Sequence, residues 1–166
     1  QNRDLVRPIT QRFLDAISWF GEGVREPSDA ASVVKFVTAL ERLLMTQEHD
    51  DIAKVVSERC GAFCLVMDVD ASLERWRCDT RRLYDLRSRL VHGDLSPASK
   101  EVREGVRLGI EIVPLATLSA LAHFGEHGLR AERVPTGRLA KWFDAIVEQS
   151  EQLSDGEPTA SAARTR

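Results

Sequence analysis

The chain has 166 residues and a mass of 18.6 kDa, a length that fits one domain with a sizeable hydrophobic core. Hydrophobic residues make up 43% and charged residues 30% of it, which excludes a wholly disordered chain. The net charge of −3 argues against a protein that coats nucleic acid with its whole surface. No uninterrupted run reaches the ~18 apolar residues that a membrane span requires, so no membrane partner is expected.

The charge distribution, the cysteines and the first residue each give an expectation about the protein. Residues 73–107 hold 9 basic and 6 acidic side chains, so the middle of the chain is locally positive. The three cysteines cannot all pair with one another, and no secretory signal pattern is present, which together predict a cytoplasmic protein. Because the sequence starts at Gln1 rather than at methionine, an upstream sensor domain is one expectation.

Apolar residues recur at helical spacing from the start of the chain. The first helix is expected to end at Gly21 and Gly23, because glycine commonly terminates helices. Ser28 is a suitable N-cap for a second helix, since its hydroxyl can accept a backbone N–H of the first turn. Asp50 or Asp51 can cap a third helix in the same way.

The pattern continues through the second half of the chain. Residues 67–78 are expected to be irregular or only briefly helical, and Asp79 or Thr80 is expected to cap a fourth helix that ends at Gly93. A long helix follows. Pro114 must kink or split it, because proline lacks an amide proton and clashes with the preceding turn.

Several helices joined by short links predict an all-α fold, an up-and-down antiparallel helical bundle with a C-terminal helical extension. The bundle is expected over residues 1–128. The extension is expected over residues 129–153, where apolar residues at helical spacing run from about Gly137 to Leu153. Residues 154–166 contain no aromatic residue, and a disordered tail is expected there.

Two pairs of residues have the i, i+4 spacing of metal ligands on one helix face, namely Cys60 with Cys64 and His123 with His127. Each pair would supply half of a tetrahedral site, and neither has the other half at a recognisable spacing. Buried thiols and helix-end histidines are therefore the preferred interpretation, and neither a metal nor a cofactor is expected.

The most informative stretch is 81–94, whose sequence is RRLYDLRSRLVHGD. Asp85 lies four residues from both Arg81 and Arg89, a spacing typical of solvated helix ion pairs worth a few tenths of a kcal/mol each. His92 directly precedes a glycine, where the helix dipole favours a cation. On this interpretation the segment is an ordinary charged helix.

The same segment resembles the signature of the HEPN superfamily, and most closely its Apea-like branch. The core of that signature is an arginine followed, after four intervening residues, by a histidine, here Arg87 and His92. Tyr84, Ser88 and Gly93 match the branch in register. Ser88 matches the Apea-like branch but departs from many active members of the wider superfamily, which have Asn, Asp or His directly after the arginine.

The resemblance extends upstream and covers roughly residues 13 to 125. Trp19-Phe20, Ala39-Leu40-Glu41 and Arg59 of the third expected helix fall where the family has similar residues. Membership implies an all-α bundle, and many members are metal-independent endoribonucleases that act as dimers in prokaryotic antiviral defence or toxin systems. Other members lack activity and serve as binding or scaffold modules. This chain keeps both signature residues, which favours the active class.

The chemistry of the two residue types suits RNA cleavage without a metal. RNA cleaves itself when its 2′-OH attacks the adjacent phosphorus, which requires proton transfer and stabilisation of extra negative charge. Histidine, with an unperturbed pKa near ~6.5, can move the proton at neutral pH. Arginine stays charged and can bind two phosphate oxygens at once. RNA is therefore the expected substrate.

The spacing of Arg87 and His92 adds a geometric constraint. Residues five apart on an ideal helix point about 140° from each other. Either the helix loosens at Gly93, so that His92 swings round, or two copies meet about a two-fold axis and two pairs line one cleft. The family resemblance implies the second arrangement, a homodimer with a composite site.

The sequence thus assigns roles to eight residues. Arg87 and His92 are the catalytic candidates; Tyr84, Ser88 and Glu41 are candidate supporting residues; Arg81, Arg82 and Arg89 are candidate RNA-binding residues, for which solvated ion pairs are an equal alternative. The alternative function is a non-catalytic dimerisation or ligand-binding module. A toxin held in check by an antitoxin is a further possibility that the sequence does not separate from a defence effector.

Overall fold

The computed structural model describes residues 9–46, 51–68, 71–126 and 134–156, and within these ranges it contains helices and no strand. The helices are α1 (Ile9–Arg25), α2 (Asp29–Leu44), α3 (Ile52–Met67), α4 (Leu73–His92), α5 (Lys100–Glu126) and α6 (Thr136–Gly156). The prediction of an all-α helical bundle is confirmed.

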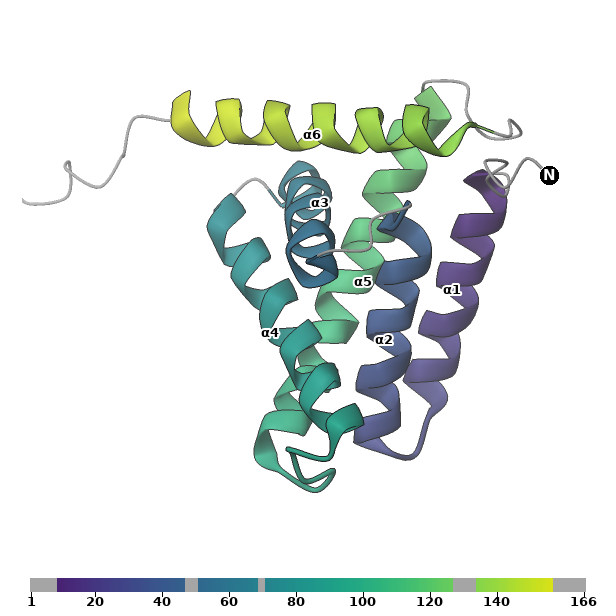
Figure 1. Ribbon diagram of the computed structural model, residues 1–166, viewed down its shortest axis with the longest axis vertical. Coiled ribbons are helices and arrows are strands. Elements are labelled where there is room, and N and C mark those ends of the chain that lie inside the picture. Colours follow the sequence, from purple (N-terminus) through teal and green to yellow (C-terminus); the bar gives the residue numbers. More distant parts are fainter. Residues whose placement is uncertain (1–8, 47–50, 69–70, 127–133, 157–166) are drawn as a thin grey trace, which may run out of the picture.

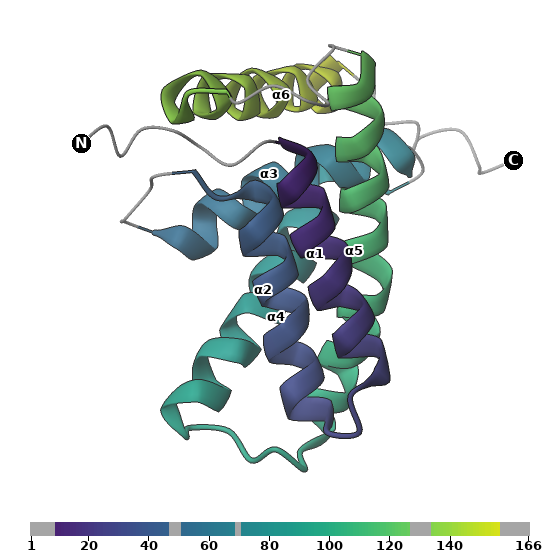
Figure 2. The same ribbon diagram turned by 90° about the vertical axis from the view of Figure 1, so that its right-hand side faces the viewer.

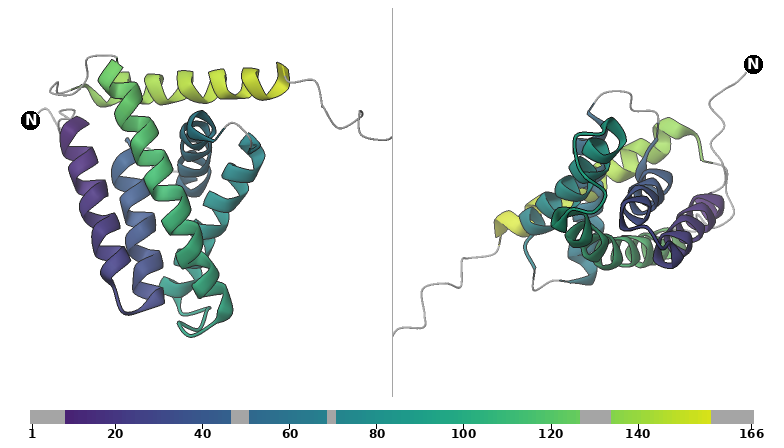
Figure 3. Two further views of the ribbon diagram at one scale, coloured as in Figure 1. Left: turned by 180° about the vertical axis from the view of Figure 1, so that it is seen from behind. Right: turned by 90° about the horizontal axis from the view of Figure 1, so that it is seen from below.

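The helices α1, α2, α4 and α5 run along the long axis of the molecule (Figure 1). α1 and α2 are antiparallel neighbours, and so are α4 and α5, whereas α3 lies across the bundle between α2 and α4 (Figures 1 and 2). Seen from behind, α5 crosses over α2 (Figure 3). The up-and-down arrangement therefore holds for α1, α2, α4 and α5, and α3 and α6 depart from it.

The core contains large side chains from nearly every helix. The largest fully buried ones include Trp76 of α4, Phe36 of α2 and Phe63 of α3. Phe36 lies against Gly23 of α1 and Gly109 of α5, where a Cβ atom at either glycine would overlap the ring. These two glycines allow α1 and α5 to approach α2 closely.

The helix termini follow local side-chain chemistry. The side chains of Ser28, Asp51 and Ser72 accept backbone N–H groups at the starts of α2, α3 and α4. Gly93 ends α4 with a left-handed backbone at φ 80°, a conformation that glycine adopts without the steric cost of a Cβ atom. The predicted caps at Ser28 and Asp51 and the predicted stop at Gly93 are confirmed.

Three predicted local features are wrong. α1 continues through Gly21 and Gly23 to Arg25. Gly23 does not end the helix; its missing side chain makes room for the Phe36 ring. Residues 73–78 are not irregular, since α4 begins at Leu73 behind the Ser72 cap and not behind Asp79 or Thr80. The helix that carries residues 81–92 is therefore about two turns longer than predicted.

Of the two effects expected of Pro114, a split is wrong, because α5 is one helix from Lys100 to Glu126 with the proline inside it. A kink stays a prediction. The backbone group that proline leaves without a partner is the carbonyl four residues earlier, on Ile110. The Ile110 side chain is 48% exposed, so the face of α5 that carries this residue borders solvent.

By length and composition, Lys100–Gly125 of α5 could cross a membrane, with a mean hydropathy of 1.5 in its most apolar window. The same helix packs against α1, α2, α3 and α4 in the centre of the bundle, and 44% of that window is buried inside the protein. Core helices of soluble proteins pass the same test, so the finding is weak support for a membrane span.

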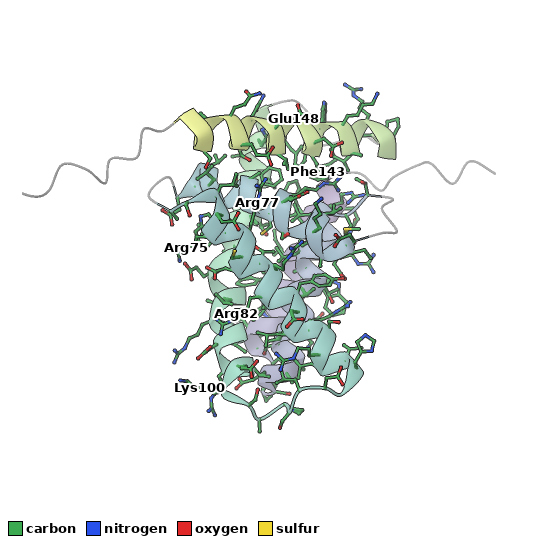
Figure 4. All side chains as sticks on the ribbon, turned by 60° about the vertical axis from the view of Figure 1, so that its left-hand side comes forward. Arg75, Arg77, Arg82, Lys100, Phe143 and Glu148 are labelled. Atoms are coloured by element: carbon green, nitrogen blue, oxygen red, sulfur yellow. The ribbon has the colours of Figure 1, made fainter. Side chains whose placement is uncertain are left out.

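α6 lies across one end of the bundle (Figures 1 and 4). Phe143 of α6 is buried, with its ring centre 6.0 Å from that of Phe63, and the guanidinium of Arg59 lies 4.7 Å from the centre of the Phe143 ring. Arg77 of α4 is ion-paired with Glu151 at 2.6 Å. The predicted C-terminal helix is confirmed and extends to Gly156, whereas residues 127–133 and 157–166 lie outside the described residues.

Candidate functional site

α4 carries Tyr84, Arg87, Ser88 and His92, and Gly93 directly follows it. Its sequence favours a helix up to His92. Ser72 caps its start, Glu74 lies in the first turn, and Arg89 and His92 lie in the last, so charges at both ends complement the helix dipole. The N–H of Asp94 donates to the carbonyl of Arg89 at 2.8 Å, which closes the last turn around Gly93.

Tyr84, Arg87 and Glu41 form a polar cluster between α4 and α2. The Tyr84 hydroxyl donates to Oε1 of Glu41 at 2.9 Å, and the Arg87 guanidinium donates to the same oxygen at 3.4 Å. The Arg87 guanidinium carbon also lies 5.5 Å from the centre of the Tyr84 ring. Three of the eight residues singled out from the sequence are thus brought together.

Arg87 is incompletely satisfied in this cluster. Its side chain is 29% exposed, and its Nε atom is buried without a hydrogen-bond partner. A guanidinium has five N–H donors, and a buried donor without a partner is costly. The bond to Glu41 engages one terminal nitrogen of the guanidinium, so Glu41 does not use the full donor capacity of Arg87.

Tyr84 is a hydrogen-bond donor over the neutral pH range. Burial, followed by the hydrogen bond to Glu41, raises the pKa of its hydroxyl above the usual value. The hydroxyl therefore keeps its proton at neutral pH and orients the Glu41 carboxylate. Of the supporting residues predicted from the sequence, Tyr84 and Glu41 contact Arg87, and Ser88 is half-buried.

His92 does not join this cluster in a single chain. It is exposed and is the last residue of α4, and the helix is continuous up to it. The helix has therefore not loosened at Gly93. Since Arg87 is turned towards α2 by its contact with Glu41, helix geometry places His92 about 140° away, on the face of α4 that carries Ser88 one turn earlier.

The predicted RNA-binding arginines differ from one another. Arg82 is ion-paired with Glu104 of α5, and Arg89 is ion-paired with Glu101 of α5 at 2.8 Å and with Asp85 at 3.8 Å. Arg81 is exposed, and no ion pair to it is found among the described residues. Arg82 and Arg89 thus form ion pairs, as the alternative predicts, and their role in RNA binding stays a prediction.

The ion pairs between α4 and α5 form a row that the sequence analysis did not predict. Arg75, Arg82 and Arg89 are seven residues apart, and each pairs with a glutamate of α5: Glu111, Glu104 and Glu101, respectively. Figure 4 shows Arg75, Arg82 and Lys100 along the same side of the molecule. The seven-residue spacing of the arginines was the available signal, since it places them on one helix face.

Cys60 and Cys64 are buried in α3, as the preferred interpretation of buried thiols predicts. The Sγ atoms of Cys60 and Cys64 lie 4.0 Å apart, and both side chains are fully buried. The contact with Cys60, followed by burial, raises the pKa of the Cys64 thiol, which keeps it protonated. No group of three or more His, Cys, Asp or Glu residues suited to a metal ion is found in the described part of the chain; His127 lies outside it.

Comparison with known proteins does not identify a relative of this chain. No family model matches it, and neither a curated protein nor a solved structure gives a match. The assignment of function therefore depends on the site itself and on the resemblance of residues 81–94 to the HEPN signature.

Proposed function

We propose that this chain is a HEPN-type endoribonuclease effector that cleaves single-stranded RNA without a metal. The observation that carries the proposal is the state of Arg87, a half-buried cation with an unsatisfied Nε and one long ion pair. Five residues further along the same helix lies the exposed His92. The reaction needs a cation that binds phosphate and a group that transfers a proton, and arginine and histidine are side chains of these two kinds.

Arg87 binds the scissile phosphate, because its remaining donors match the phosphate oxygens. His92 transfers the proton as general acid or base, the role that histidine fills most often in enzymes, and its exposure leaves the imidazole open to the RNA. The 2′-OH of the RNA attacks the adjacent phosphorus, and the bond to the 5′-oxygen of the next nucleotide breaks. The products are a 2′,3′-cyclic phosphate and a 5′-hydroxyl.

A homodimer supplies the geometry that one chain lacks. Arg87 is turned towards α2 and His92 is on a different face of α4, so one chain does not direct both at a single phosphate. A two-fold axis beside α4 presents the same face twice, and two Arg87–His92 pairs then line one cleft. Arg81 is exposed on α4 and guides RNA towards this cleft.

The proposed setting is the prokaryotic cytoplasm, in an antiviral defence or toxin system. An effector that cuts RNA without a cofactor must be restrained, and an antitoxin or an upstream sensor domain is the proposed partner. This assignment rests on the resemblance to the HEPN superfamily.

A non-catalytic dimerisation or ligand-binding module is the second candidate. The pairing of Arg87 with Glu41 and the separation of His92 from both favour it, because a site arranged in this way in one chain binds an anion without cleaving it. Binding of RNA without cleavage by the wild-type protein would support this candidate.

The deciding experiment is incubation of the purified protein with labelled RNA in EDTA, beside His92→Ala. The variant is expected to lose at least ~100-fold of the cleavage rate, the contribution of a general acid or base, and to keep the fold because His92 is exposed. Lys141→Ala, an exposed residue of α6, serves as the matched control. Undiminished cleavage by folded His92→Ala would overturn the proposal.

A further inference from the structure

Oε1 of Glu41 is shared by two donors of α4. The Tyr84 hydroxyl holds it at the short distance of 2.9 Å, and the Arg87 guanidinium reaches it at 3.4 Å. Glu41 is 23% and Arg87 29% exposed, so the pair is screened by solvent only in part. Glu41 therefore supplies the negative charge that faces Arg87 in the isolated chain.

A phosphate group offers Arg87 the same interaction with better geometry. A phosphate presents several oxygens and can accept two parallel N–H bonds, whereas the shared Glu41 oxygen takes one long bond from Arg87. A phosphate near Arg87 also lies near Glu41, and the two anions repel each other. Glu41 and phosphate are consequently competitors for the same cation.

We infer that Glu41 is an internal competitor that holds Arg87 in a resting state, and that an RNA phosphate must displace it before the site is formed. The inference rests on the proposed role of Arg87 as the phosphate ligand. On this inference Glu41 weakens RNA binding in the resting state, whereas Arg87 and His92 bind and cleave the RNA. Glu41 is a positioning residue here, since it acts on the phosphate through Arg87.

Tyr84 sets the strength of this restraint. Its hydroxyl and the Arg87 guanidinium donate to the same Glu41 oxygen, at 2.9 Å and 3.4 Å respectively. The hydrogen bond from Tyr84 is the shorter one, so it weakens the bond that this oxygen accepts from Arg87. Removal of the hydroxyl leaves the carboxylate to Arg87 alone and strengthens their pairing. Removal of the carboxylate charge frees Arg87. The two changes therefore have opposite effects on phosphate binding.

The test is a titration with inorganic phosphate, followed through the Nε–Hε NMR signal of Arg87. The signal is assigned by its loss in Arg87→Lys. In Glu41→Gln, which keeps an acceptor for Tyr84, half-saturation is expected at about twofold to fivefold less phosphate than in the wild type, the range that a partly screened ion pair is worth. In Tyr84→Phe, half-saturation is expected at a higher phosphate concentration than in the wild type.

Weaker binding in both variants would show that Glu41 merely supports Arg87, and unchanged binding in Glu41→Gln would show that the pair is unimportant; either result overturns the inference. An Arg87 signal that does not respond to phosphate in any protein overturns it as well. Should the wild type fail to cleave RNA while the opposite shifts are observed, the proposed catalytic function fails and the competition at Arg87 stands.

Discussion

Arg87 and His92 occupy the same helix but different surroundings. Arg87 contacts Glu41 and Tyr84 at the junction of α4 with α2, whereas His92 is exposed at the last turn of α4. Their separation by about 140° follows from helix geometry, and the continuous helix leaves no local distortion to correct it. The proposed reaction therefore requires a second chain, so that an arginine and a histidine from the two chains can reach one phosphate.

The first prediction concerns this assembly. The active protein is expected to be a dimer in sedimentation experiments at micromolar concentration, with the two α4 helices facing each other. A mixed dimer of wild-type and His92→Ala chains, isolated with two different tags, is expected to have less than half of the wild-type activity, because the two pairs line one cleft. A fully active monomer would contradict the composite site.

The second prediction concerns the products. Attack by the 2′-OH leaves a 2′,3′-cyclic phosphate and a 5′-hydroxyl, whereas water activated by a metal ion leaves other ends. Mass spectrometry of the fragments distinguishes the two. RNA with a 2′-deoxy nucleotide at the scissile position is expected to resist cleavage there, and DNA is expected to remain intact. A 3′-hydroxyl with a 5′-phosphate, or an absolute need for a divalent cation, would show the mechanism to be wrong.

The third prediction compares two neighbouring arginines of α4. Arg81 is exposed, whereas Arg82 is ion-paired with Glu104 and must leave that partner to bind a phosphate. Arg81→Ala is expected to weaken RNA binding and to lower the slope of log K against log salt by about 1. Arg82→Ala is expected to have a smaller effect on both quantities.

Binding is measured with the His92→Ala protein, so that the RNA stays intact, over a series of salt concentrations. Lys141→Ala on α6 removes the same charge away from α4 and is the control. Equal losses for Arg81→Ala and Arg82→Ala would mean that the ion pair with Glu104 does not limit RNA binding.

Local chemistry made much of the fold predictable. The caps at Ser28 and Asp51 and the stop at Gly93 are short-range features, because each depends on a side chain and a backbone group within one turn. The predicted helix end at Gly23 was wrong because this glycine makes room for the Phe36 ring of the neighbouring helix. Sequence spacing within one helix does not reveal such a contact.

The start of α4 was missed although a signal for it was present. Leu73, Trp76, Thr80 and Leu83 are buried at spacings of three and four residues, the pattern of a helix face, and Ser72 precedes them. The many charges between them obscured the pattern. The pairing of Arg82 with Glu104, in contrast, depends on how α4 and α5 are aligned, and the separate sequences of two helices do not fix that alignment.

The last prediction concerns the ionisation of Tyr84, which can be measured without RNA. Tyr84 is the only tyrosine in the chain, so the change in ultraviolet absorbance that accompanies tyrosinate formation reports on it alone. Burial and then the hydrogen bond to Glu41 raise its pKa, and the midpoint in the folded protein is expected above the ordinary value of about 10. In Glu41→Gln the midpoint is expected to fall but to stay above that value, because burial is the larger cause.

The same shift predicts how stability depends on pH. Above pH ~10 the unfolded chain loses the tyrosine proton while the folded chain keeps it, so the unfolded state binds fewer protons and the free energy of unfolding decreases as pH rises. The contribution is fully present below the unfolded pKa and is lost as pH rises through the raised folded pKa. Tyr84→Phe has no such proton and is expected to lose less stability over this range in urea titrations. A wild-type midpoint at or below the ordinary value would show that Tyr84 is not held against Glu41 in solution.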